Sequence, residues 1–177
     1  MLLKLENRIN AFSDALGWLA AVLLILLLLN VFVDVVMRYL FNDVSIAMQE
    51  MEWHLFSAMF MFGVSYSLRQ NGHVRVDLIY ERLTPQKRAW INIGGVLIFL
   101  LPFTLLVTWY GIGYVQDSFA LNEQSGDPGG LPYRYLIKAV IPVSFIAMAI
   151  SGAGLLLHSV NVLRGVHSEE PLEKIVP

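Results

Sequence analysis

The four histidines are the residues best suited to cofactor chemistry, because an imidazole can ligate haem iron. They are His54, His73, His158 and His167. A bis-histidine haem needs two ligands at one membrane depth on facing helices. The topology argued below leaves His73 with His158 as the sole candidate pair, and the polar sequence around His73 predicts a loop. A haem-binding membrane subunit of an oxidoreductase is therefore the alternative function.

A second polar group lies within an apolar segment. Asn30, Asp34 and Arg38 are spaced four apart, so they share one face of a helix. An unpaired carboxylate in a membrane is costly, and Arg38 can pair with Asp34 from one turn away. The group has two interpretations. It is a functional site, as a contact surface or an acid on an ion path, or it is a structural ion pair near the end of a helix.

A third group opens the next apolar run. Glu50 and His54 are four residues apart, and Glu52 points to another side. We expect them at the depth of Arg38, so an Arg38–glutamate bridge between the first two helices is predicted. Such a bridge would hold a hairpin together but would not by itself make a catalyst.

Other chemistry has little support in the sequence. Cysteine is absent, which excludes disulfides, thiolate metal sites and a cysteine nucleophile. There is no nucleophile motif, phosphate-binding glycine loop or HExxH pattern. The net charge is −2, and no basic patch is interleaved with aromatics as in nucleic-acid-binding proteins. We expect no enzyme activity, no cofactor, no metal and no nucleic acid partner.

The elements that position these residues are apolar helices. Of the 177 residues, 56% are hydrophobic and 15% charged, against about 25% charged in soluble domains. Charge-free runs cover 15–33, 89–116 and 139–163, and crossing a bilayer takes roughly 20 residues. A shorter run lies between Glu52 and Arg69. We predict a single all-α membrane domain over 1–177 with four transmembrane helices, at 15–38, 50–68, 86–117 and 134–163.

The segments between these spans have their own signals. Apolar residues share one face of 1–12, which favours a short interfacial helix before the first span, and 69–84 has room for a similar turn. Thr84 and Pro85 are a typical helix start, and Pro102 is expected to kink the third span. Glycines and prolines in 120–132 mark a loop.

Basic residues predict the orientation. Most Lys and Arg lie in the N-terminal segment, the 69–88 connection and the C-terminal tail, whereas Arg38, Arg134 and Lys138 lie on the other side. The positive-inside rule then places both termini in the cytoplasm.

Several short motifs follow one another in a fixed order: Arg38-Tyr39, Gln49-Glu50-x-Glu52-Trp53-His54, Gly63, Gly72-His73-Val74-Arg75-Val76-Asp77, and Pro132 with Ile141-Pro142. This order resembles the DctQ family, the small membrane subunits of tripartite ATP-independent periplasmic (TRAP) transporters. The family commonly has a tryptophan ahead of the acid in the second span. Here Trp53 follows the acids, so no role is assigned to it alone.

The resemblance implies four membrane helices with both ends cytoplasmic, in the bacterial inner membrane and surrounded by lipid. It implies a large partner subunit (M) that holds the substrate and sodium sites. It also implies a periplasmic binding protein (P) that delivers an organic acid or related carboxylated solute. The small subunit would be a scaffold. An independent four-helix channel or chaperone is a third interpretation.

The resemblance and the residue patterns together nominate contact sites. At the outer side the expected inter-helix or inter-subunit contacts are Asp34, Arg38, Glu50, Glu52 and His54. Gly72, His73 and Asp77 would shape the inner connection or meet the partner, and local turn chemistry explains them equally well. In the loop over 120–135, Glu123, Asp127 and Arg134 are candidates for docking the periplasmic protein.

Overall fold

The computed structural model describes residues 2–70, 80 and 82–166. Its elements are α1 (Leu2–Leu40), α2 (Ile46–Arg69), α4 (Pro85–Gly95), the π-helical turn η1 (Val96–Leu100), α5 (Leu101–Ala120) and α6 (Tyr135–Leu163). No strand occurs within these described ranges. The prediction of an all-helical chain is therefore confirmed.

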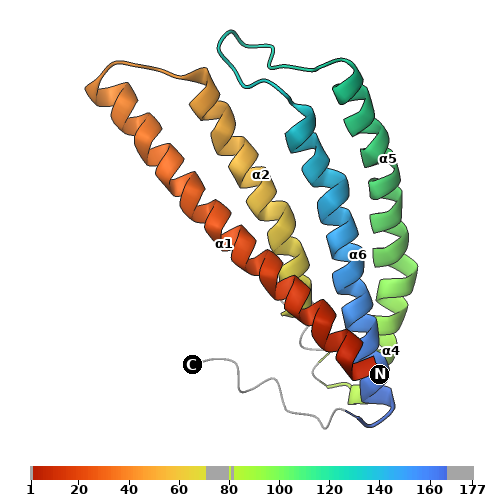
Figure 1. The fold of residues 1–177 in the computed structure, drawn as a ribbon. Coiled ribbons are helices and arrows are strands. Elements are labelled where there is room, and N and C mark those ends of the chain that lie inside the picture. The colour runs from red at the N-terminus through yellow and green to blue at the C-terminus, as the bar shows by residue number, and fades with distance from the viewer. Residues whose placement is uncertain (1, 71–79, 81, 167–177) are drawn as a thin grey trace.

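The helices alternate in direction along the chain. Figure 1 shows α1 and α2 as a hairpin, then α4, η1 and α5 as one long rod, and α6 returning beside it. The N-terminus and the end of α6 lie at one end, here called the inner end. The α1–α2 turn and the α5–α6 loop (121–134) lie at the other, here called the outer end. The side of the membrane that each end faces stays a prediction.

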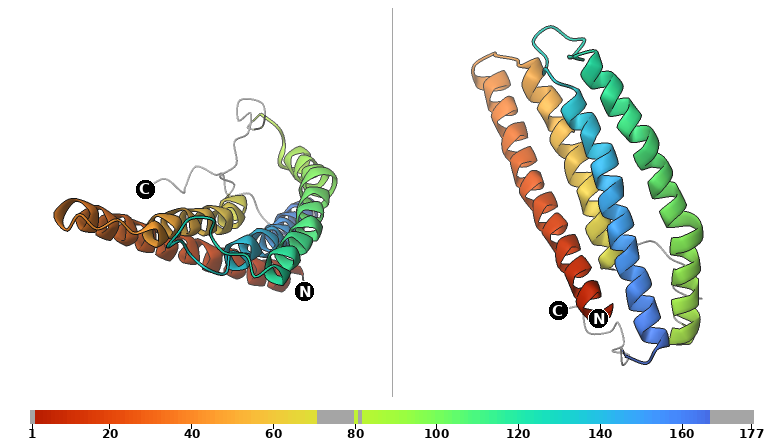
Figure 2. Two further views of the ribbon diagram at one scale, coloured as in Figure 1. Left: turned by 90° about the horizontal axis from the view of Figure 1, so that it is seen from above. Right: turned by 45° about the vertical axis from the view of Figure 1, so that its right-hand side comes forward.

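Helix α6 occupies the centre of the arrangement. It contacts α1, α2, α4, η1 and α5, whereas the α1–α2 hairpin and α5 stand on opposite sides of it (Figure 2). The helices therefore form a curved row with α6 as the common neighbour. A row exposes more helix surface than a closed bundle of the same helices.

Three of the four rods are long and apolar enough to cross a membrane: α1, the combined Pro85–Ala120 rod and α6. Helix α2 is not among them, which agrees with its short charge-free run between Glu52 and Arg69. Its crossing stays a prediction. All three candidate spans have exposed apolar side chains, for example Leu28 on α1 (60% exposed), Trp109 on α5 (77%) and Leu136 on α6 (62%).

The interior is made largely of small polar residues. The most buried side chains include Ser13, Ser65, Thr104, Ser118, Ser144, Ser159 and Asn161. Membrane helices associate through small and polar residues because lipid removes the usual hydrophobic drive between helices. Polar residues inside and large apolar residues outside therefore favour a lipid-embedded protein.

The expected interfacial helix at 1–12 continues directly into the first span, and its position at the membrane surface stays a prediction. Residues 2–40 form one continuous helix, and neither glycine nor proline interrupts residues 2–16. The N-terminal turns also pack on α6, where a Cβ built on Gly154 would lie 2.8 Å from Ile9 Cγ2. Ser13 Oγ lies 2.8 Å from Ser151 Oγ in the same contact. These contacts extend the helix below the predicted span.

The third rod begins at Pro85 with Thr84 as its N-cap residue, although the Thr84 side chain makes no capping hydrogen bond. The predicted irregularity at Pro102 takes the form of η1, which ends just before it. Proline has no N–H to donate, and its ring conflicts with the carbonyl four residues back, here Ile98. A π-helical turn absorbs such a mismatch within a continuous helix.

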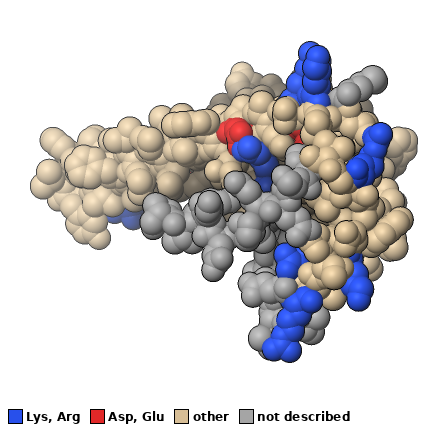
Figure 3. Space-filling view, turned by 90° about the horizontal axis from the view of Figure 1, so that it is seen from below, with Lys and Arg blue, Asp and Glu red and all other residues tan. Residues whose placement is uncertain are grey.

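Basic side chains surround the inner end when it is viewed from below (Figure 3). The exposed members among the described residues are Lys4, Arg8, Arg82, Lys87 and Arg164. At the outer end, Arg38, Arg134 and Lys138 each contact an acid of this chain. Within the described ranges, the basic side chains of the outer end are thus paired with acids, and those named at the inner end are exposed.

Candidate functional site

A buried glutamate joins α2 to the α5–α6 loop. Helix α2 starts at Ile46 because Ser45 caps it, with the Met48 N–H donating to the Ser45 hydroxyl at 3.3 Å. Glu50 follows one turn later and is only 6% exposed. The cap therefore fixes the end of the helix that presents Glu50 to the loop.

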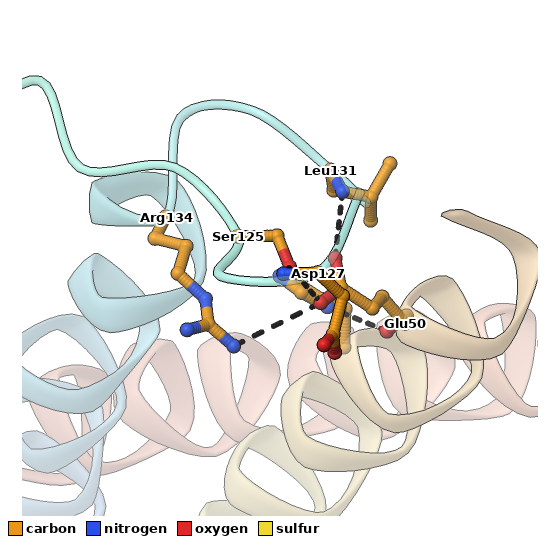
Figure 4. A network of polar contacts seen from close by, with 6 residues as sticks. Glu50, Ser125, Asp127, Leu131 and Arg134 are labelled. Carbon is orange, nitrogen blue, oxygen red and sulfur yellow. Dashed lines mark hydrogen bonds and ion pairs between the residues drawn. The ribbon is translucent and has the colours of Figure 1, made fainter. Parts of the chain in front are cut away.

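Three groups from the loop region surround the Glu50 carboxylate (Figure 4). The Ser125 hydroxyl donates to Oε1 at 2.5 Å, and the Leu131 backbone N–H donates to Oε2 at 2.6 Å. The guanidinium of Arg134 lies 3.9 Å from Oε1. Hydrogen bonds to an ionised carboxylate are shorter and stronger than neutral ones, so this glutamate is a firm anchor for the loop.

The loop is folded on itself before it meets Glu50. Asn122 takes a left-handed conformation (φ 44°) directly after α5, which turns the chain away from the helix axis. The Ser125 N–H then donates to the Leu131 carbonyl at 3.1 Å, and the Arg134 N–H donates to the Glu123 carbonyl at 3.0 Å. These two backbone pairs close the loop into a compact hairpin-like unit.

Gly130 allows the loop to approach Glu50 closely. A Cβ at this position would lie 2.4 Å from Ser125 Oγ and 2.9 Å from Glu50 Oε2. Both distances are shorter than a van der Waals contact. Any side chain at residue 130 would therefore displace the hydroxyl that bonds Glu50.

Arg134 lies between the carboxylate and an aromatic ring. Its guanidinium carbon is 5.6 Å from the centre of the Trp53 ring, within the range of a cation–π interaction. Trp53 in turn contacts His54, with ring centres 4.0 Å apart. His54 Nδ1 lies 2.6 Å from the Glu50 carbonyl oxygen of the preceding turn. Trp53, to which the sequence assigned no role, thus belongs to the site.

A second anchor ties the loop to α6 and α5. Lys138 forms an ion pair with Glu123 and lies 4.1 Å from the centre of the Tyr114 ring. Glu123 lies in the loop, outside the helices. The pKa of its carboxyl is below its usual value, chiefly because Lys138 donates a hydrogen bond to it. The loop is thus held from α2 on one side and from α6 on the other.

The predicted Asp34–Arg38 pair is present in α1. Asp34 is 2% exposed. The expected Arg38–glutamate bridge is wrong, because Arg38 pairs one turn back on its own helix while Glu50 bonds the loop. Near the outer end, α1 and α2 are joined instead by the Asn30 side-chain N–H, which donates to the Met48 carbonyl at 2.9 Å. Asp14 and Arg69 form an ion pair between the same two helices nearer the inner end.

The remaining predicted residues fall into two groups. Glu52 is partly exposed two residues beyond Glu50, and Asp127 has an exposed side chain at the loop tip, where its N–H donates to Ser125 Oγ at 3.1 Å. Gly72, His73 and Asp77 lie outside the described residues. The His73–His158 haem pair lies partly outside them too, so its geometry is untested.

An inner polar cluster was not predicted. Glu6, 3% exposed, accepts a hydrogen bond from the Asn161 side chain at 2.6 Å, and His158 Nδ1 lies 2.9 Å from its other oxygen. His158 and Asn161 are three residues apart, so one face of α6 holds both. In the sequence, only this spacing indicated a polar cluster on α6. It does not identify Glu6, near the N-terminus, as the partner.

The outer site binds and orients the loop. Within the described ranges, no group of three or more His, Cys, Asp or Glu residues could hold a metal ion. Glu50 is occupied by donors on both carboxylate oxygens. The arrangement therefore fixes a surface in place, which is the property that a docking or bracing subunit needs.

Comparison with known proteins identifies the family of this chain. The family described as "Tripartite ATP-independent periplasmic transporters, DctQ component" matches residues 27–162. A Haemophilus influenzae protein, provisionally named as a TRAP transporter small permease protein, is 31% identical over 152 residues. That alignment covers 82% of this chain and 89% of the relative. The matched family range includes the entire Glu50 site but not Glu6.

Proposed function

Because the chain belongs to the DctQ component family of the TRAP transporters, we propose that it is a non-catalytic scaffold for a large transport subunit. In this proposal the M subunit holds the substrate and sodium sites and moves against the scaffold. A periplasmic P protein delivers the solute. The sodium-coupled uptake of an organic acid or related carboxylated solute is taken from the family resemblance.

The observation that carries the scaffold proposal is the double anchoring of the α5–α6 loop. Glu50 ties it to α2, and Lys138 ties its start to α6. Helices α2 and α5 are on opposite sides of α6 (Figure 2), so the loop links the two halves of the row at the outer end. A linked row resists bending better than separate helices, which suits a fixed frame.

The apolar faces of the row support an inner-membrane location for the proposed subunit. Large apolar side chains remain exposed along α1 and α5, including Leu28 on α1 and Phe103 on α5 (58%). Lipid and a partner subunit are the environments in which such surfaces are stable. The basic inner end supports a cytoplasmic location for both termini.

The proposed docking surface narrows to the loop tip. Glu123 pairs with Lys138. Arg134 contacts Glu50 and the Trp53 ring. In this proposal the main role of Glu123 and Arg134 is to hold the loop in place. Asp127 has an exposed side chain, and we assign the contact with the periplasmic protein to it.

The functional test is uptake by reconstituted vesicles. Vesicles containing the large subunit, the periplasmic protein and this chain should accumulate substrate, whereas vesicles lacking this chain should accumulate little. This chain alone should give no uptake. Full uptake without it would contradict the scaffold role, and uptake by the chain alone would favour an independent transporter.

A further inference from the structure

Among the described residues, the inner end has a surplus of exposed positive charge. In the part of the chain that the structure describes, the acids at this end are Glu6 and Asp14. Glu6 is buried and bonds Asn161, and Asp14 pairs with Arg69. None of the exposed cations forms an ion pair with a described residue; they are Lys4, Arg8, Arg82, Lys87 and Arg164.

The outer end provides an internal comparison. Its cations are Arg38, Arg134 and Lys138, and each has a carboxylate of this chain within ion-pair distance. Among the described residues, the cations at the outer end are therefore paired with carboxylates, whereas Lys4, Arg8, Arg82, Lys87 and Arg164 at the inner end are exposed. A binding partner with negative charge is thus expected at the inner end.

Contacts with α6 show that these cations lie at similar depth. Leu100 packs against Gly152. From that contact Lys87 lies about 20 Å and Arg164 about 18 Å toward the inner end, at 1.5 Å per helical residue. On α1, Glu6 bonds Asn161, one turn from Arg164. Lys4 and Arg8, two residues either side of Glu6, therefore lie near the same level.

The cations border surfaces that are suited to lipid. Lys87, Trp90 and Ile91 share one face of α4 because they are spaced three and four apart. Trp90 is 65% exposed and Ile91 52% exposed. Tryptophan is enriched at the membrane–water interface. On this face the Lys87 amine therefore lies on the inner side of the Trp90 ring and the Ile91 side chain. Lys4 and Arg8 are likewise one turn apart on a single face of α1.

We propose that Lys4, Arg8, Lys87 and Arg164 bind the phosphate groups of anionic phospholipids at the membrane surface around the inner end. Basic side chains next to a membrane surface attract anionic lipid. The four residues come from three elements arranged around this end, next to lipid-facing helix sides. That distribution fits several lipid headgroups better than one acidic protein surface.

The test uses the full chain in lipid nanodiscs made of phosphatidylcholine with or without phosphatidylglycerol. Native mass spectrometry counts the lipids retained by the protein. The wild type should retain phosphatidylglycerol several-fold over phosphatidylcholine, and high salt should weaken that preference. The variant K4Q/R8Q/K87Q/R164Q should lose it, while K4R/R8K/K87R/R164K should keep it because the charge is unchanged.

Several outcomes would overturn the proposal. The wild type could retain both lipids equally, or its preference for phosphatidylglycerol could be insensitive to salt. The glutamine variant could also keep the full preference for phosphatidylglycerol. Thermal stabilisation by inorganic phosphate alone, equal to that by phosphatidylglycerol, would assign the cations to a free anion instead. Because the measurement needs no other subunit, its result is independent of the transporter proposal.

Discussion

The backbone N–H of Leu131 donates to Glu50 Oε2 at 2.6 Å and joins residues 81 positions apart in the chain. The contact unites the first turns of α2 with the last part of the α5–α6 loop. It uses a charged acceptor and a backbone donor, a strong combination in a buried setting. Together with the hydrogen bond from the Ser125 hydroxyl, this contact attaches the α5–α6 loop to α2.

Glu50→Gln should loosen the α5–α6 loop. The amide keeps one acceptor oxygen but places an NH₂ group against either the Ser125 hydroxyl or the Leu131 N–H. We expect faster hydrogen exchange and faster protease cleavage within 121–134, with a fall of a few degrees in the unfolding temperature. The matched control is Glu52→Gln, two residues along the same helix. Equal effects of both substitutions would contradict the anchoring role.

Gly130→Ala should be destabilising because its Cβ would lie 2.4 Å from Ser125 Oγ. Forcing a methyl group into a packed site costs about 1–3 kcal/mol. The free energy of unfolding in detergent measures the cost. Gly126→Ala is the control, since nothing lies within 4 Å of a Cβ there. A Gly130→Ala protein as stable as the Gly126→Ala protein would refute the close approach.

Acidification should remove the contribution of the Glu123–Lys138 pair. The pKa of Glu123 lies below its usual 4.5, chiefly through the hydrogen bond from Lys138. A carboxyl with a lowered folded-state pKa stabilises the fold above its unfolded pKa, and this contribution is lost as the pH falls through the folded value. The stability difference between wild type and Glu123→Gln should therefore be largest near neutral pH and shrink below about pH 4.5. A constant difference down to pH 3 would show that the charge of Glu123 is unimportant.

Asp127→Lys should weaken docking of the periplasmic protein without changing the fold. The side chain is exposed at the loop tip. Asp127 contributes to the loop hydrogen bonds through its backbone, because its N–H donates to Ser125 Oγ and its carbonyl accepts from the Gly130 N–H. Binding of the periplasmic protein to the reconstituted complex should fall several-fold, with an unchanged unfolding temperature. Unaltered uptake and binding in this variant would remove the loop tip from the docking surface.

Local relationships were predictable from the sequence, and distant ones were not. The Asp34–Arg38 pair follows from a spacing of four on one helix. The Glu50–Leu131 contact could not be predicted, because its donor is a backbone group that every residue except proline possesses. The Glu6–Asn161 bond was likewise missed, since it depends on where the N-terminal turns of α1 pack on α6.

The apolar runs predicted where the long helices lie. The ends of the helices depend on contacts with other helices, which the sequence does not reveal. The first turns of α1 pack against α6, where Gly154 lies close to Ile9, and this contact was not predicted. Hydrophobic periodicity reports lipid-facing surface and does not identify such packing. The roles of Gly72, His73 and Asp77 stay predictions, as they lie outside the described residues.

Co-purification tests the central claim most directly. The chain, tagged and expressed at its native level, would be extracted from native membranes in mild detergent, and the proteins that accompany it identified by mass spectrometry. The scaffold proposal predicts one large, many-span membrane protein in a near-equal amount. Recovery of this chain alone, or together with redox subunits, would contradict it.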